Sequence, residues 1–344
     1  MSTFINRIRL GTLGSDRGAA NASSVDGSVI VGSSPVSGYV YRAFRWTEAT
    51  GMVNIDPLGA GLSSATACSA DGSVVFGHHT PDSSRRMFRW TDAGGLEDMG
   101  VPDGVSNINI EGCSADGSVV VGWAIVQMGG ANRAFRWTEA DGFELIPQPA
   151  GYTRSRAYGC NADGSVVVGW MSVTTSSPEP FRWTEAGGME HIGTLGGATG
   201  EAKGCDASGD VIVGHSLSAD LYERPFRWTR AGGMVQLPYD SNNGVYPEAC
   251  SDDGSKIAGW AYDSNWNTVP LLWAEDGVSD IGGLDGWVNV YGISGDGSLV
   301  LGTTGDGAAY AWQDTGVKKP EYLVTSLGTL GGTNSEARAC SADG

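Results

Sequence analysis

Short apolar runs alternate with turns rich in glycine, aspartate and serine along almost the whole chain. The clearest run is a stretch of valines after an Asp-Gly-Ser turn, as in ADGSVVVG at residues 115–122. The pattern recurs at residues 25–32, 70–77 and 162–169, and in weaker form at 208–214, 252–259 and 295–302. No stretch shows the apolar spacing of an amphipathic helix. The pattern therefore predicts short β-strands throughout.

Two further anchors recur in register with the valine run. The first is Phe-Arg-Trp or a variant of it, with the tryptophans Trp46, Trp90, Trp137, Trp183, Trp228, Trp273 and Trp312. The second is a Gly-rich turn such as TEAGGM before a short apolar segment. A unit of about 45 residues with four strands is typical of a β-propeller blade. Because blades cannot bury their faces alone, we expect residues 1–344 to form one domain, an all-β, seven-bladed β-propeller.

The third repeat shows how each unit divides into strands. We expect strands at residues 109–114, 118–123, 134–138 and 143–146. The Asp-Gly pair between the first two strands favours a tight hairpin, because glycine accepts the positive φ that such turns need.

The chain carries one first-strand segment too many for seven blades. This segment occurs eight times, from residues 19–24 to 336–341, whereas the tryptophan strand occurs seven times. The extra copy lies within residues 327–344, which open with the same LGTLG as residues 10–14. It either covers the N-terminal blade as a clasp, pairs with another chain through a free edge, or belongs to a longer parent protein. The stop in the middle of a repeat at Gly344 favours a fragment.

The units ADGSVVVGW and AFRWTEADG resemble the repeats of HAF-type extracellular repeat proteins of bacteria, and the resemblance covers nearly the whole chain. It implies an exported or autotransported cell-surface domain, similar to an adhesin, in which the repeat motif is structural. It brings no catalytic residue with it. The Ser-x-Asp-Gly-Ser turn is also similar to the Asp-box turn of sialidases, which lies away from their chemistry.

The balance of charge limits the classes of partner. The chain has 39 acidic and 21 basic residues and a formal net charge of -18. This charge repels nucleic acid and anionic membrane surfaces, so neither is an expected partner. No stretch approaches the roughly 20 apolar residues of a membrane-spanning helix. The first ten residues lack the apolar core of a signal peptide, so an export signal would lie outside this chain.

Six cysteines occupy one position of the repeat: Cys68, Cys113, Cys160, Cys205, Cys250 and Cys340. Ser23 and Ile293 fill this position in the other two copies. We interpret it as a buried slot for a small apolar side chain, where free thiols are favoured over disulfides or a metal site. The four histidines show no ligand spacing, and we predict neither a metal nor a cofactor.

The links between strands vary at one end of the predicted ring only. The turns between first and second strands and between third and fourth strands hardly change, whereas the other links vary in length and chemistry. The variable end is therefore the expected binding face. First strands are innermost in a propeller, so the residues two positions before the cysteine slot should surround the mouth of the channel. They include Glu111, Tyr158, Lys203, Glu248 and Tyr291. The mouth is either a hydrated polar channel or a ligand funnel.

Two tryptophans fall outside the repeat and in variable links, Trp266 within the sixth repeat and Trp287 before the seventh. We expect them to lie close together. The same sector holds Tyr246, Tyr262 and Tyr291, with Glu248, Asp263 and Asn265 as polar partners. Aromatic rings beside carboxylate and amide groups suit a glycan or a peptide. The alternative is that these rings pack onto the blade. The full candidate set is Trp266, Trp287, Tyr262, Tyr246, Glu248, Tyr291, Tyr158 and Glu111.

Motifs for catalysis are absent from the sequence, including the nucleophile elbow, the P-loop and the HExxH pattern. The best-supported function is a non-catalytic, extracellular or cell-surface propeller that holds a glycan or protein partner on its variable face. One alternative is a polysaccharide hydrolase or lyase that uses Glu111, Glu201 or Glu248 as acid and base. Another is a structural module that self-associates through a terminal strand.

Overall fold

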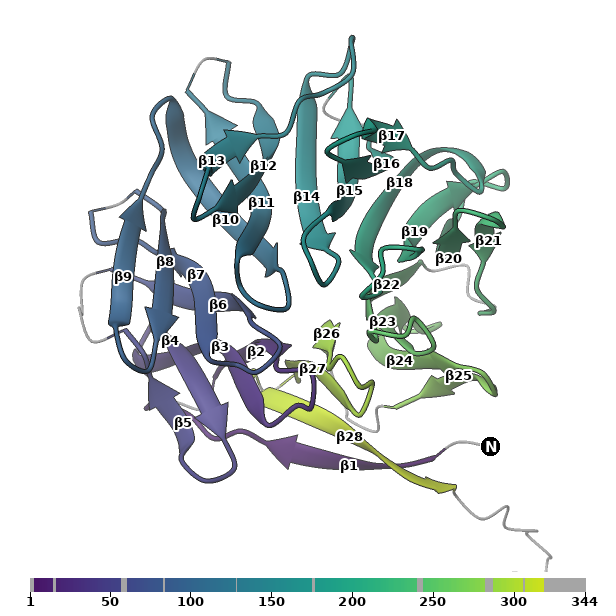
Figure 1. The fold of residues 1–344 in the computed structure, drawn as a ribbon. Helices are drawn as coiled ribbons and strands as arrows, with labels where there is room; N and C mark the ends of the chain where they lie inside the picture. Colours follow the sequence, from purple (N-terminus) through teal and green to yellow (C-terminus); the bar gives the residue numbers. More distant parts are fainter. Residues whose placement is uncertain are drawn as a thin grey trace, which may run out of the picture.

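The computed structural model describes residues 3–14, 17–56, 61–82, 84–127, 129–174, 177–239, 244–281, 287–305 and 307–318. Within this part of the chain there are 28 β-strands and no helix. The strands form seven four-stranded antiparallel sheets that stand as blades in a closed ring (Figure 1). The prediction of an all-β, seven-bladed propeller is confirmed.

Six blades each use four consecutive strands. Blades 1 to 3 consist of β2 (Ala19–Ser23), β3 (Val29–Ser37), β4 (Val40–Thr47) and β5 (Gly51–Asn54); β6 (Ser63–Cys68), β7 (Val74–His79), β8 (Arg86–Thr91) and β9 (Gly95–Gly100); and β10 (Val105–Cys113), β11 (Val119–Val126), β12 (Asn132–Thr138) and β13 (Gly142–Leu145). Blades 4 to 6 consist of β14 (Arg154–Cys160), β15 (Val166–Ser172), β16 (Glu179–Thr184) and β17 (Gly188–His191); β18 (Gly196–Cys205), β19 (Val211–Ser218), β20 (Glu223–Thr229) and β21 (Gly233–Gln236); and β22 (Val245–Cys250), β23 (Ile257–Tyr262), β24 (Thr268–Ala274) and β25 (Gly277–Asp280).

Blade 7 joins the two ends of the described chain. It consists of β26 (Asn289–Ile293), β27 (Leu299–Thr303), β28 (Ala309–Lys318) and, as its outer strand, β1 (Thr3–Arg9). Figure 1 shows β1 and β28 side by side, and Arg7 pairs with Trp312 in their antiparallel register. The N-terminal strand therefore closes the ring. The extra first-strand copy at residues 336–341 lies outside the described residues.

Strand boundaries in blade 3 differ from the predicted ones mainly at the variable end. Strand β10 begins at Val105 rather than Asn109, and β11 continues to Val126 rather than Trp123. The hairpin ladder extends beyond the recognisable motif, because backbone pairing does not require the motif residues.

A circle of backbone hydrogen bonds joins all seven blades at the turn that follows each first strand. Each N–H in this girdle donates to a carbonyl of the next blade over 2.7–3.1 Å. The donor and acceptor pairs are Val25–Ala70, Ala70–Ala115, Ala115–Ala162, Ala162–Ala207, Ala207–Asp252, Asp252–Gly295 and Asp296–Val25. The last pair connects blade 7 to blade 1, so the ring closes at the channel as well as at the outer edge.

The Phe-Arg-Trp motif contributes to the packing between blades. Its phenylalanines are fully buried in the core: Phe44, Phe88, Phe135, Phe181 and Phe226. Its arginines point to the next blade, where Arg45 and Arg182 each donate from Nε to the carbonyl of a turn glycine over 3.3 Å. The turn carbonyls thus give these guanidinium groups the polar partner that a charge close to the core requires.

The Asp-Gly-Ser turn is held by its own side chains. In blade 3, Ser114 donates to Asp116 over 2.7 Å, and Asp116 also accepts from the N–H of Ser118 over 2.9 Å. These hydrogen bonds lower the pKa of Asp116 to about 2. The turn is thus a self-contained structural unit, as the sequence predicted.

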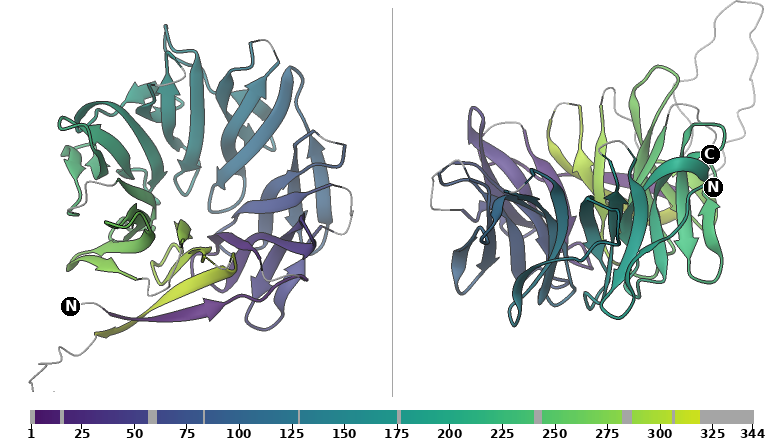
Figure 2. Two further views of the ribbon diagram at one scale, coloured as in Figure 1. Left: turned by 180° about the vertical axis from the view of Figure 1, so that it is seen from behind. Right: turned by 90° about the horizontal axis from the view of Figure 1, so that it is seen from above.

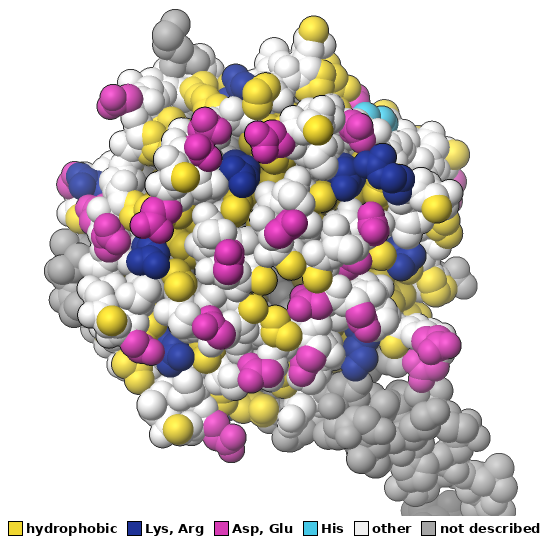
Figure 3. All heavy atoms as spheres, in the orientation of Figure 1, with side chains coloured by type: hydrophobic (Ala, Val, Ile, Leu, Met, Phe, Trp, Pro, Cys, Tyr) yellow, Lys and Arg dark blue, Asp and Glu magenta, His cyan; other side chains and the backbone are white. Residues whose placement is uncertain are grey.

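Acidic side chains are spread widely over the surface. Figure 3 shows them (magenta) around a hollow at the centre of one face, with basic side chains (dark blue) mostly farther out. This distribution agrees with the formal net charge of -18.

Candidate binding site

The channel opens at the variable face, the end of the ring that carries the links between second and third strands and the links between blades. Here a hollow of about 630 Å³, the mouth pocket, is lined by residues from the first strand of every blade. At one equivalent position of these strands they are Asn21, Thr66, Glu111, Tyr158, Lys203, Glu248 and Tyr291. The structure therefore places the predicted candidates Glu111, Tyr158, Glu248 and Tyr291 in one pocket.

A β-bulge in each first strand positions these seven side chains. The register of β10 with β11 shifts between Ile110 and Gly112, so that Glu111 has no direct partner in the ladder. The same shift occurs in the other six blades at the equivalent residue. A bulge turns a side chain away from the regular alternation of a strand, and here it turns each side chain toward the channel.

Close contact between the first two strands accompanies the bulge and explains a repeated glycine. A Cβ on Gly122 would lie 2.0 Å from the carbonyl oxygen of Asn109, and a Cβ on Gly169 would lie 1.9 Å from that of Arg156. Any larger residue would push the two strands apart. The glycine at the end of each valine run is therefore required by the backbone of the first strand.

Tryptophans on the second strands fix three of the pocket residues. The indole N–H of Trp123 donates to Glu111 over 2.8 Å, and that of Trp260 donates to Glu248 over 3.0 Å. In blade 4, Trp170 donates to the hydroxyl of Tyr158 over 3.0 Å. The partners are 12 residues apart in each blade. The hydrogen bond from this tryptophan to a pocket residue was not predicted from the sequence.

Packing between blades occurs at the same tryptophans. The guanidinium of Arg156 in blade 4 lies over the ring of Trp123 in blade 3, 4.0 Å from its centroid. The tryptophan position thus serves two roles, since its ring contacts the next blade and its N–H holds a pocket side chain.

Lys203 lies at the centre of the charged groups of the pocket. Its Nζ is 3.6 Å from Glu248, 3.8 Å from Glu201 and 4.0 Å from the ring centroid of Tyr158. Burial lowers the pKa of Lys203, but the negative charge of Glu248, with Tyr158 and Glu201, outweighs burial and raises this pKa above its usual range. The ammonium group is therefore charged at neutral pH.

Burial raises the pKa of two pocket carboxylates, Glu111 and Glu248. For Glu111 the N–H of Trp123 and the charge of Lys203 act in the opposite direction, and for Glu248 the charge of Lys203 and the N–H of Trp260 do so. Groups with such shifts occur often at functional sites, although structural networks also produce them.

Blades 2 and 5 carry His78 and His215 at the second-strand position that holds tryptophan in blades 3, 4 and 6. Among the described residues, Nδ1 of His78, Nδ1 of His215 and the Thr66 hydroxyl are buried without a hydrogen-bond partner. Burial, with the nearby charge of Arg85, lowers the pKa of His78 to about 3, and burial lowers that of His215 to about 3. Both rings are therefore neutral at neutral pH, and each leaves a buried Nδ1 atom unpaired.

The cysteine slot proves to be half-buried rather than fully buried. The five described cysteines are free thiols that pack against the core on one side and line the channel on the other. Four of them line both the mouth pocket and a smaller hollow of about 160 Å³ toward the opposite face. Burial raises the pKa of Cys68 and of Cys160 to about 12, so these thiols are protonated. Cys340 lies outside the described residues.

The two unmatched tryptophans lie together at the rim of blades 6 and 7. The ring of Tyr262 is 5.6 Å from that of Trp266 and 6.4 Å from that of Trp287. The exposed fractions of these tryptophans are 61% and 59%. We call Tyr246, Trp260, Tyr262, Trp266 and Trp287 the aromatic shelf. The expectation that the two tryptophans lie close together is confirmed, and they do not pack down as buried rings.

Trp266 adopts a backbone conformation that is unfavourable for its side chain. Its φ is +65°, and the only other described non-glycine residue with positive φ is Leu221. Asp263 holds the link by accepting the N–H groups of Asn265 and Asn267, each over 2.8 Å. The carboxylate of Asp263 thus shapes the turn, and its predicted role as a polar partner for a ligand stays a prediction. Such strain costs about 1–2 kcal/mol and presents the ring to solvent.

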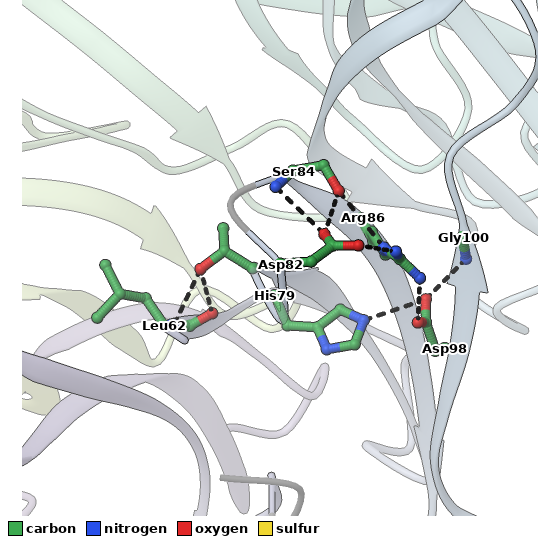
Figure 4. Close-up of polar contacts among 8 residues, drawn as sticks. Leu62, His79, Asp82, Ser84, Arg86, Asp98 and Gly100 are labelled. Atoms are coloured by element: carbon green, nitrogen blue, oxygen red, sulfur yellow. Dashed lines mark hydrogen bonds and ion pairs between the residues drawn. The ribbon is translucent and has the colours of Figure 1, made fainter. Parts of the chain in front are cut away.

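The equivalent rim of blade 2 is occupied by charged side chains. Figure 4 shows Arg86 between Asp82 and Asp98, with His79 on the other side of Asp98. His79 is buried and its Nε2 is 3.1 Å from Asp98, while Arg86 is 3.0 Å from the same carboxylate. Burial raises the pKa of Asp98, but the N–H of Gly100, together with His79 and Arg86, outweighs burial. The pKa of Asp98 is therefore lowered.

Neither a metal-binding cluster nor a spanning helix is found in the part of the chain that the structure describes. No three His, Cys, Asp or Glu side chains there are grouped in a way that could hold a metal ion. None of the described segments forms a helix that is long and apolar enough to cross a membrane.

Comparison with known proteins identifies the fold. No protein-family model and no curated protein matches the chain. An oligogalacturonate lyase in complex with manganese superposes with a TM-score of 0.66 and 14% identity, over 93% of this chain and 94% of that one. A putative TolB from Agrobacterium tumefaciens superposes with a TM-score of 0.55 and 16% identity, over 87% of this chain and 99% of that one. The chain spans 64% of TolB from Acinetobacter baumannii. At these identities the likeness shows a propeller and no activity.

Proposed function

We propose that this chain is a non-catalytic binding propeller that holds a glycan on its variable face. The aromatic shelf carries the proposal. Two tryptophans that are about 60% exposed flank Tyr262, and one of them is held at positive φ. Rigid rings supply contact area for a sugar at a small loss of conformational entropy.

Polar groups next to the shelf complete the chemistry of a glycan site. Glu248, Lys203 and Tyr158 lie in the mouth pocket, where carboxylate, ammonium and hydroxyl groups can exchange hydrogen bonds with sugar hydroxyls. The volume of about 630 Å³ falls within the usual range for small-ligand pockets, about 300–1,000 Å³.

An extracellular location fits this function. The repeats resemble those of HAF-type surface proteins, and a propeller named as a putative TolB is among the similar structures. We propose display outside a bacterial cytoplasm, with the variable face directed at its ligand.

A glycan array tests the proposal. The intact chain should bind at least one class of glycan, and the double variant Trp266→Ala, Trp287→Ala should lose that binding while retaining its melting temperature. Tyr39→Ala is the matched control, because Tyr39 is 80% exposed in the corresponding link of blade 1, away from the shelf. It should bind like the parent chain.

Other outcomes of the array would overturn the proposal. Absence of binding across a broad array would exclude a glycan and favour a protein partner. Equal loss in the Tyr39→Ala control would show that the binding is non-specific adsorption to exposed rings.

A polysaccharide lyase or hydrolase is the second candidate function. The observations in its favour are the raised pKa values of Glu111 and Glu248 beside a charged Lys203, and a similar structure that is named as an oligogalacturonate lyase. Incubation with a panel of polysaccharides would reveal catalysis as new chain ends. Turnover that disappears in Glu111→Gln or Glu248→Gln would replace the binding proposal with this one.

A further inference from the structure

The aromatic shelf and the mouth pocket form one continuous surface. Trp260 lines the pocket and also stacks on Tyr246, with ring centroids 4.5 Å apart and an interplanar angle of 29°. The ring centroids of Trp260 and Tyr262 are 5.2 Å apart in an edge-to-face arrangement, and Tyr262 contacts both exposed tryptophans. A ligand on the exposed rings is therefore led along aromatic faces to the wall of the pocket.

The pocket admits a linear chain only by its end. First strands from all seven blades surround it, so no side is open to a polymer that crosses the face. Beyond the pocket the channel continues as a smaller hollow of about 160 Å³, and four cysteines line both hollows. A chain that follows the shelf inward therefore places its terminal ring first in the larger hollow.

Charges of both signs lie around the pocket. Glu111, Glu201 and Glu248 supply three carboxylates. Lys203 and Arg156 supply cations, and Arg85 adds a third by donating to Asn109 on the first strand of blade 3. An acidic sugar would meet the carboxylates and an amino sugar would meet the cations. An uncharged ring whose hydroxyls both donate and accept avoids either repulsion.

We propose that the mouth pocket takes the terminal ring of an uncharged linear oligosaccharide whose following rings lie on the aromatic shelf. This inference rests on the proposed glycan function and adds that the protein recognises chain ends. Lys203, Glu248 and Glu111 bind the terminal ring, and Trp266 and Trp287 stack on the rings that follow.

Calorimetric titration with defined oligosaccharides tests the inference. The ligands are linear malto-, cello- and manno-oligosaccharides of two to six rings, each with free ends, with a bulky label on the reducing end, or with an acetal on the non-reducing end. Acidic oligomers of galacturonate serve as the charged comparison. Blocking one particular end should weaken binding about tenfold or more, since it removes hydrogen bonds to charged groups.

Variants separate the pocket from the shelf. Glu111→Gln keeps the shape of the side chain and Lys203→Met keeps its length, and both should reduce affinity for free-ended chains about tenfold without changing affinity for blocked ones. Trp287→Ala should weaken both forms. Melting temperatures show whether each variant folds, and Glu111→Gln remains informative if Lys203→Met does not.

Three results would overturn the inference. Blocked and free chains that bind equally, with loss in Trp287→Ala, would leave the glycan function in place and exclude end recognition. Tighter binding of galacturonate oligomers would contradict the balance of charge. Absence of binding by every oligosaccharide and by the glycan array would remove the proposed function itself.

Discussion

Blade 2 and blade 6 carry equivalent links between their second and third strands, and the two links present opposite chemistry at the same rim. In blade 2, Asp82 and Asp98 neutralise Arg86, and Asp98 also contacts the buried His79 (Figure 4). In blade 6, the link carries Trp266, whose ring is 61% exposed. One rim satisfies its own charges, and the other leaves aromatic area for a ligand.

The scaffold beneath the two rims is the same. Both first strands carry the bulge, both second strands hold a glycine close against the first strand, and both blades belong to the backbone girdle. The difference teaches that the repeat determines the fold, whereas each link is free to acquire its own chemistry. The following four predictions test this separation, from the largest expected effect to the smallest.

Alanine in place of the second-strand glycine that packs against the first strand should destabilise both blades equally. A Cβ on Gly77 would lie 2.1 Å from the carbonyl oxygen of Ser64, and one on Gly259 would lie 2.3 Å from that of Tyr246. We expect Gly77→Ala and Gly259→Ala each to lower the free energy of unfolding by about 3 kcal/mol, measured by urea denaturation. Gly159→Ala is the control, because its Cβ would meet nothing closer than 3.7 Å. Unequal losses in the two blades would contradict a shared scaffold.

Binding should respond to one rim only. Trp287→Ala is expected to weaken glycan binding about 30-fold, as for a hot-spot aromatic residue, because it removes an exposed face of the shelf. Arg86→Ala in blade 2 should leave the dissociation constant unchanged. Titration of both variants with the same glycan gives the comparison, and a loss in Arg86→Ala would show that the blade 2 rim also contacts the ligand.

Removal of Asp98 should weaken blade 2 without affecting the ligand site. We expect Asp98→Ala to lower the free energy of unfolding by about 1–2 kcal/mol at pH 7, because the buried His79 loses its partner. The folded-state pKa of Asp98 is lowered, so its contribution is present at neutral pH and is lost as the pH falls below its ordinary value of 3.8. Urea denaturation at pH 7 and at pH 3 should therefore show a smaller difference at pH 3. A constant difference would exclude the ionised carboxylate as its source.

Glycine in place of Trp266 should stabilise the protein and weaken the proposed glycan binding. Glycine accepts positive φ without strain, so Trp266→Gly should raise the free energy of unfolding by about 1 kcal/mol and weaken glycan binding. Leu221→Gly is the matched control at φ +66° in blade 5, and should give the same stabilisation with unchanged binding. A Trp266→Gly variant that loses stability would show that the ring contributes to packing.

The fold follows from sequence because its signals are local and repeated. Turn glycines, valine runs and tryptophan strands each specify a strand or a hairpin, and seven copies determine the architecture. The proximity of Trp266 and Trp287 was also predictable, since both links fall at one end of adjacent repeats.

Other features depend on contacts that the local pattern does not encode. The bulge has no residue signature, because its position holds Asn, Thr, Glu, Tyr or Lys. The closing strand Thr3–Arg9 carries none of the repeat anchors, and pairs with β28 only in three dimensions. The grouping of Lys203 with Glu248 depends on the distance between blades. The constant spacing of 12 residues between the bulge residue and the second-strand tryptophan was the one available signal for the hydrogen bonds that join them.

The girdle of backbone hydrogen bonds connects every repeat to its neighbours in the same way, so one repeat can replace another. It joins backbone N–H and carbonyl groups at the turn of each repeat, where the side chains differ and include Val25, Ala70 and Asp252. A repeat exchanged together with its links would therefore meet the same connections on both sides. Transplanting the sixth repeat into the place of the second would give this ring a second set of exposed aromatic residues, so new specificity can be assembled by recombination of whole repeats.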